Sequence, residues 1–210
     1  GKGSMLVNTV GLANVSVGDG NMGSNTEGEC NTSVGQGALN ANTTGDSNVS
    51  LGRQSLKSNT TASNNTAIGT FALCANTTSS SNTAVGSSAL CSNTTGQFNT
   101  ALGVESLRDN TTADGNVAVG HAALRVNTTG ANNTAVGGLE AGTFGVLQSN
   151  TTGSKNAGIG NGVLKANTTG TNNTALGYIA LCDNTTGGNT VAIGNCALKS
   201  QTTGDSNIAV

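Results

Sequence analysis

Apolar residues recur along the chain with a period of 17 residues. If the glycine that follows each Thr-Ala-Val-like stretch is position 0, position 4 is Leu or Met in every unit, and position 16 is Val, Ile or Leu. Small residues, mostly Ala, precede both, and the polar stretch Asn-Thr-Thr-Gly fills positions 7–10. The glycines at position 0 are Gly1, Gly18, Gly35, Gly52, Gly69, Gly86, Gly103, Gly120, Gly137, Gly160, Gly177 and Gly194.

This pattern predicts an all-β fold. The Thr-Ala-Val stretches favour short strands, and Asn-Thr-Thr-Gly favours turns, where Asn and Gly tolerate a left-handed backbone. Seventeen residues are too few for a helical-hairpin repeat of about 33, and Gly, Asn and Thr are poor in helix interiors. We therefore expect a parallel β-solenoid (a β-roll or β-helix) of twelve 17-residue rungs. At a strand spacing of about 4.8 Å, it forms a rod of roughly 58 Å.

The repeat accounts for residues 1–210, which predicts one repetitive segment and no second domain. The one irregularity is a six-residue insertion near 138–143, expected to bulge as a surface loop that is neutral for function. Joining residues 207–210 to residues 1–5 recreates a proper unit. We therefore expect the chain to be a fragment of a longer solenoid.

Stacked rungs bring identical residues into columns. Asn at position 7 and Thr at position 8 are expected to form ladders of hydrogen bonds along the rod, since a buried Asn needs partners. The same Asn residues begin Asn-Thr-Thr glycosylation sequons, but an inward-facing Asn could not be modified. The predicted ladder comprises Asn42, Thr43, Asn59, Thr60, Asn76, Thr77, Asn93, Thr94, Asn110, Thr111, Asn127, Thr128, Asn150, Thr151, Asn167, Thr168, Asn184 and Thr185.

Strand parity predicts self-association. Neighbouring residues of a strand point to opposite faces, so in each apolar pair (positions 3 and 4, and 15 and 16) the small residue is expected inside and the large one outside. The resulting apolar stripe would be covered by other copies, most simply in a homotrimer. The alternative is a bend at position 0 that turns both large residues inward. The candidate interface residues are Val85, Leu90, Leu102, Leu107, Val119 and Leu124.

Composition narrows the function. Aromatic residues make up 2% and charged residues 9% of the chain, and the net charge is −2. Low charge argues against ordinary disorder and against nucleic-acid binding. No apolar run reaches the roughly 18 residues of a membrane span. The single histidine, His121, falls at a variable position that we expect to be exposed, and no nucleophile–base pair or metal-ligand cluster stands out. We expect no enzyme activity, cofactor or metal.

Cysteines occupy a column that is otherwise basic. Cys74, Cys91 and Cys182 lie at position 5, where other rungs carry Lys or Arg, so we expect the column to be exposed. Cys74 and Cys91 fall in adjacent rungs, within disulfide range, although parallel side-chain directions are unfavourable for a bond. An inter-chain disulfide through these three cysteines is one interpretation, and unreactive surface thiols are the other.

Two stretches, 82–96 (NTAVGSSALCSNTTG) and 173–187 (NTALGYIALCDNTTG), resemble the shaft repeats of phage tail fibres that precede an intramolecular chaperone domain. They are more loosely similar to the head β-rolls of trimeric autotransporter adhesins. The resemblance covers the whole chain and implies a trimeric fibre at a cell surface, on a virion or otherwise extracellular. A receptor or glycan would then be bound by a part outside this sequence.

The predicted function is therefore a structural fibre shaft that projects an adhesive or receptor-binding tip. One alternative is an extracellular filament whose subunits join end to end. A less favoured alternative is ice binding, which requires Thr at alternate positions so that the side chains share one flat face. The Thr pair at positions 8 and 9 is adjacent, so its side chains are expected to point to opposite faces.

Overall fold

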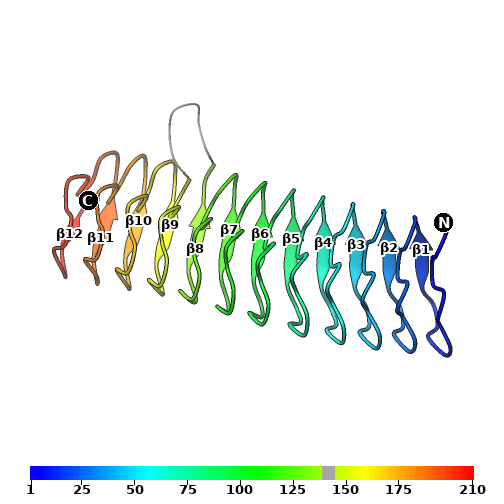
Figure 1. Cartoon of the computed structure of the whole chain (residues 1–210). Helices are drawn as coiled ribbons and strands as arrows, with labels where there is room; N and C mark the ends of the chain where they lie inside the picture. The colour runs from blue at the N-terminus through cyan, green and yellow to red at the C-terminus, as the bar shows by residue number, and fades with distance from the viewer. Residues whose placement is uncertain (139–144) are drawn as a thin grey trace.

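The chain forms a parallel β-solenoid. The computed structural model describes residues 1–138 and 145–210, which contain strands and turns and no helix. Twelve short strands form a single sheet in chain order, and Figure 1 shows them side by side along the rod from the N-terminal blue end to the C-terminal red end. The strands are β1 (Val15–Val17), β2 (Thr32–Val34), β3 (Val49–Leu51), β4 (Thr66–Ile68), β5 (Thr83–Val85), β6 (Thr100–Leu102), β7 (Val117–Val119), β8 (Thr134–Val136), β9 (Ala157–Ile159), β10 (Thr174–Leu176), β11 (Val191–Ile193) and β12 (Ile208–Ala209).

Every strand pairs with the next one in the register that the repeat predicts. Between β5 and β6, for example, Ala84 lies opposite Ala101. The same register holds across the insertion, where Ala135 of β8 lies opposite Gly158 of β9. Of the predicted surface loop at 138–143, residues 139–143 lie outside the described residues. The predicted solenoid and its 17-residue rung are confirmed.

The glycine at position 0 makes a corner after each strand. Gly103 has a φ of 140°, a backbone conformation that side chains disfavour. A Cβ atom placed there would lie 2.5 Å from the carbonyl oxygen of Gly120, the equivalent glycine of the next rung. Rungs can therefore stack at strand spacing only if this position lacks a side chain, which explains why glycine recurs here.

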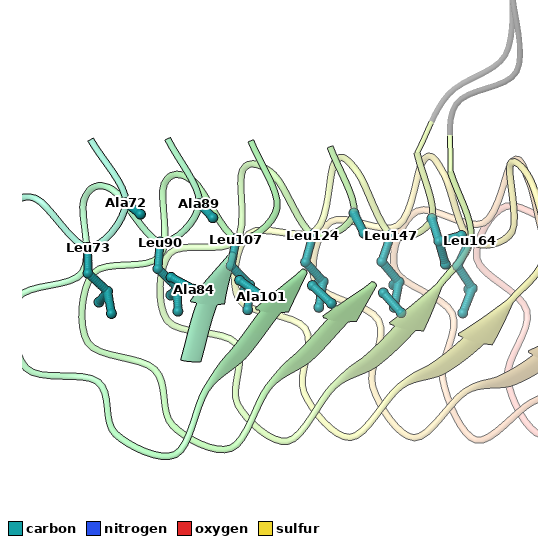
Figure 2. Packing of buried hydrophobic residues seen from close by; sticks show 14 of the residues in the cluster. Ala72, Leu73, Ala84, Ala89, Leu90, Ala101, Leu107, Leu124, Leu147 and Leu164 are labelled. Atoms are coloured by element: carbon teal, nitrogen blue, oxygen red, sulfur yellow. The ribbon is translucent and has the colours of Figure 1, made fainter. Parts of the chain in front are cut away.

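The interior of each rung has an apolar half. Leu at position 4 and the small residues at positions 3 and 15 are buried along most of the rod, for example Leu90, Ala89 and Ala101. Figure 2 shows the leucines of successive rungs in a row along the rod, beside the strands of the sheet. Since most rungs bury one large apolar side chain, and two rungs add a valine at position 3 (Val146 and Val163), the core is a narrow column that continues from rung to rung.

The predicted outward position of Leu90, Leu107 and Leu124 is wrong. All three are fully buried within the chain. Parity fails here because positions 3 and 4 belong to a turn, and position 4 has a left-handed backbone, with φ of 49° at Leu90. Strand alternation does not apply to such a turn, so Ala89 and Leu90 both face the core. The large residue at position 4 therefore faces inward, whereas the one at position 16 faces outward, so the alternative in which both face inward is not what the chain adopts.

Candidate functional site

The outer face of the sheet is the most regular apolar surface of the rod. Strand alternation places position 15 inside and positions 14 and 16 outside, and the structure follows it at Val85, Leu102 and Val119. Leu102 retains 47% of its exposure, while Val85 and Val119 are half-buried by their neighbours. Val, Ile or Leu occupies position 16 of every rung. The predicted apolar stripe therefore exists, but it is one column wide because position 4 does not contribute.

The second half of the interior is an amide ladder. The side-chain Nδ2 of Asn110 donates to Oδ1 of Asn93 at 2.9 Å, and Asn93 donates in the same way to Asn76 at 3.2 Å. Nδ2 of Asn93 also donates to the carbonyl oxygen of Gly96 in its own rung, at 2.9 Å. These asparagines are fully buried. The same rung-to-rung bond is made by Asn25, Asn42, Asn59, Asn76, Asn93, Asn110, Asn127, Asn150, Asn167 and Asn184.

The threonines at position 8 complete this ladder in the opposite direction. Oγ1 of Thr94 donates to the backbone carbonyl of Thr111 in the next rung, at 3.1 Å. All nine threonines of the predicted ladder donate in this way, from Thr43 to Thr185. The predicted Asn and Thr ladders are therefore present. Because the ladder asparagines are buried and hydrogen-bonded, their sequons are inaccessible to glycosylation in the folded rod.

A second amide column, at position 13, has a role that the sequence pattern did not reveal. Oδ1 of Asn82 accepts the backbone N–H of Asn99 at 3.0 Å, and Nδ2 of Asn99 donates to the carbonyl of Ala113 at 2.8 Å. These asparagines thus satisfy backbone groups at the turn that precedes each strand. The recurrence of Asn at position 13 was the sequence signal for this column. One sequence does not show, however, which backbone groups a recurrent Asn binds.

The cysteine column is less exposed than expected. Cys74 and Cys91 are half-buried, and their Sγ atoms are 2.7 Å apart within one chain. Cys182 is buried, with 8% exposure, and burial raises the pKa of its thiol. Cys30 and Cys196, which lie in other columns, are the exposed thiols. The structure therefore places Cys74 and Cys91 in contact and Cys182 apart from them, and the predicted inter-chain disulfide stays a prediction.

The ionisable side chains of the described ranges are scattered along the rod, with one small ion-pair cluster. No group of three or more His, Cys, Asp or Glu side chains that could hold a metal ion occurs in residues 1–138 and 145–210. His121 is exposed. Arg108 and Arg125, in neighbouring rungs, both contact Glu105, at 3.4 and 3.5 Å.

No known family model matches this chain, and no curated protein or solved structure is significantly similar to it. None of the described residues forms a helix with the length and hydropathy needed to cross a membrane.

Proposed function

We propose that this chain is the shaft of an extracellular or virion-associated fibre, that it self-associates, most simply as a homotrimer, and that it holds a binding tip away from a surface. The observation that carries the proposal is the continuous sheet from β1 to β12, in which each rung is bonded to the next through its backbone and its side chains. Such a rod supplies length and stiffness, the properties that a shaft requires.

The side-chain ladders support a mechanical role. A force that separates two rungs must break the bonds of the Asn and Thr ladders together with those of the sheet. Because the bonds of the Asn ladder are buried, water does not replace them until the rungs have opened. Such a structure resists fraying in its middle and is loosest at its ends, as in other stacked-repeat proteins.

The outer sheet face supports self-association. Its position 16 column is apolar in every rung, and a continuous apolar strip of this kind on a soluble rod marks an interaction surface. A second copy of this chain is the occupant that we favour, because a copy carries the same column at the same rung spacing. Three copies around one axis would cover the position 16 column of each copy. Two copies packed face to face would also cover their columns, so the number of copies must be measured.

The test is the mass of the purified chain in solution by light scattering after size exclusion. We expect a mass near three times the 20.4 kDa chain mass. Replacing Val85, Leu102 and Val119 together with Lys should reduce the particle to one chain while the β-sheet circular dichroism is retained. The matched control places Lys in the same rungs on another face, at the exposed Thr78, Thr95 and Thr112, and should leave the assembly intact. A single-chain mass for the unaltered protein would contradict the proposal, and a two-chain mass would contradict the trimer alone.

A second candidate function, ice binding, is favoured by one observation on the same face. Position 14 carries Thr in several strands, two residues from the apolar column, so Thr and aliphatic methyl groups form parallel rows on the outer face. Thr83 and Thr100, at position 14, are two residues from position 16 and so lie on the same outer face of the sheet. The threonines at positions 8 and 9 are adjacent and do not share a face in this way. A thermal-hysteresis measurement on the monodisperse rod tests this function. Freezing-point depression abolished by the triple Lys variant would support it, and no depression would exclude it.

A further inference from the structure

The strongest unexplained feature is the pair of stacked thiols in the position 5 column. Cys74 lies in the turn between β4 and β5, and Cys91 lies in the equivalent turn one rung later, with 2.7 Å between their Sγ atoms. The backbone around them is fixed on both sides: the N–H of Ala75 donates to the carbonyl of Cys91 at 3.0 Å, and that of Ser92 donates to Arg108 at 2.9 Å. The two sulfur atoms are thus held in contact by the stacking of the rungs themselves.

Cations flank this pair along the same column. Lys57 occupies position 5 in the preceding rung, and Arg108 occupies it in the following rung. The pKa of Cys91 is lowered to about 7, first because the thiol of Cys74 donates a hydrogen bond to its thiolate and then because Arg108 is positive; burial and the negative charge of Asp109 oppose this. The same shared proton raises the pKa of Cys74. The shared hydrogen bond and the positive charge of Arg108 therefore favour the thiolate, the reactive form of cysteine, at Cys91.

We propose that Cys74 and Cys91 are a redox modification site at which a small-molecule disulfide such as oxidised glutathione closes a disulfide bond between adjacent rungs of one chain. The Cys91 thiolate attacks one sulfur of the small disulfide, which breaks its S–S bond and releases one thiolate that takes up a proton. Cys74 then loses its proton and attacks Sγ of Cys91, which expels the second small thiol. Two protein thiols are oxidised, and one small disulfide is reduced to two thiols.

The geometry suits this closure within the chain, because the side chains of Cys74 and Cys91 converge to an Sγ–Sγ distance of 2.7 Å instead of pointing in parallel. Rungs stack at about 4.8 Å, inside the 4.4–6.8 Å range of Cα separations found in disulfides. Half-burial leaves both thiols partly exposed to a small reagent. The bond would join the turn before β5 to the turn after it, and would keep these two adjacent rungs from separating.

Cys182 provides a comparison in the same column. It also lies between basic rungs, with Lys165 before it and Lys199 after it, but no cysteine occupies an adjacent rung at that position. Burial raises the pKa of its thiol. Basic neighbours without a stacked second thiol should therefore not produce the reaction.

Trypsin separates the two cases, because no Lys or Arg lies between residues 58 and 107 or between residues 166 and 198. Peptide 58–108 contains Cys74 and Cys91, and peptide 166–199 contains Cys182 and Cys196 from different columns. The reduced chain is incubated in glutathione redox buffers, quenched with acid, unfolded, alkylated and digested. By mass spectrometry, peptide 58–108 should lose both alkylation sites and two hydrogens, whereas peptide 166–199 should form no internal bond.

The variant Cys74→Ala isolates the first step. Cys91 should then accumulate one glutathione per chain, and the pH midpoint of its alkylation rate, near 7 in the unaltered chain, should rise because the hydrogen-bond donor is lost. The proposal is overturned if peptide 58–108 keeps both alkylation sites in buffers that oxidise a reference dithiol. It is also overturned if the peptide appears only as pairs linked between chains, or if Cys74→Ala leaves the pH midpoint unchanged.

Discussion

The two halves of the rung interior hold the rod together in different ways. The apolar half, built from positions 3, 4 and 15, gains stability from burial, which has no direction and tolerates small displacements. The amide half, built around Asn at positions 7 and 13, gains little net free energy per bond but requires each partner to lie one rung away. The comparison indicates that leucine supplies most of the stability, while asparagine fixes the 17-residue register.

The largest expected effect comes from the apolar half. Leu107→Ala should destabilise the rod by about 3 kcal/mol, since a fully buried leucine is lost and the stacked rungs cannot close the cavity. Urea unfolding followed by circular dichroism measures the change. The matched control is Leu102→Ala, five residues earlier on the outer face. In the single, unassociated chain it should cost less than about 1 kcal/mol, because the side chain of Leu102 is already exposed there. Equal losses for the two variants would contradict the assignment of the core.

A smaller loss is expected from the amide half. Asn93→Ala removes the acceptor of Asn110 and the donor to Asn76, and leaves buried polar atoms without those partners. The expected cost is about 2 kcal/mol. Hydrogen exchange should quicken at amides of the rungs on both sides of residue 93, because the ladder is broken there. Exchange that stays unchanged would show that the ladder does not hold the register.

The smallest effect is expected at the edge of the ladder. Thr94→Val keeps the side-chain shape and removes the bond from Oγ1 to the carbonyl of Thr111, at a cost of about 1 kcal/mol. Its neighbour Thr95 is exposed, so Thr95→Val should change the unfolding free energy by less than half as much. A chemical denaturation series on both variants measures the difference. If Thr95→Val were the more damaging, the assigned direction of the Thr column would be wrong.

The chain itself contains two substitutions in the amide half. Thr190 takes the place of Asn at position 13, and its N–H still donates to Oδ1 of Asn173, at 3.2 Å. Gln201 replaces Asn at position 7 and reaches the carbonyl of Gly204 at 2.8 Å, but Oδ1 of Asn184 has no hydrogen-bond partner. The position 13 column therefore keeps its rung-to-rung bond at Thr190, whereas the position 7 ladder loses its rung-to-rung bond at Gln201 and keeps only the bond within the rung.

The sequence predicted the rung, the strand register, the ladder at positions 7 and 8, and the outward face of position 16, because each follows from a fixed period and strand parity. It failed at Leu90 and its equivalents, because a left-handed leucine is rare in proteins and no local signal marks it. The sequence predicted that Cys74 and Cys91 lie in adjacent rungs. It could not predict that their Sγ atoms touch within one chain, because that depends on the direction of the side chains at position 5.

Small-angle X-ray scattering from the purified chain tests the central claim, a stiff self-associating shaft, most directly, since it reports the length and the cross-section of the same particle. The account predicts a rod about as long as twelve stacked strands, roughly 58 Å, with a mass per length of three chains. Scattering from a compact globule, or from a rod that is one chain thick, would contradict it.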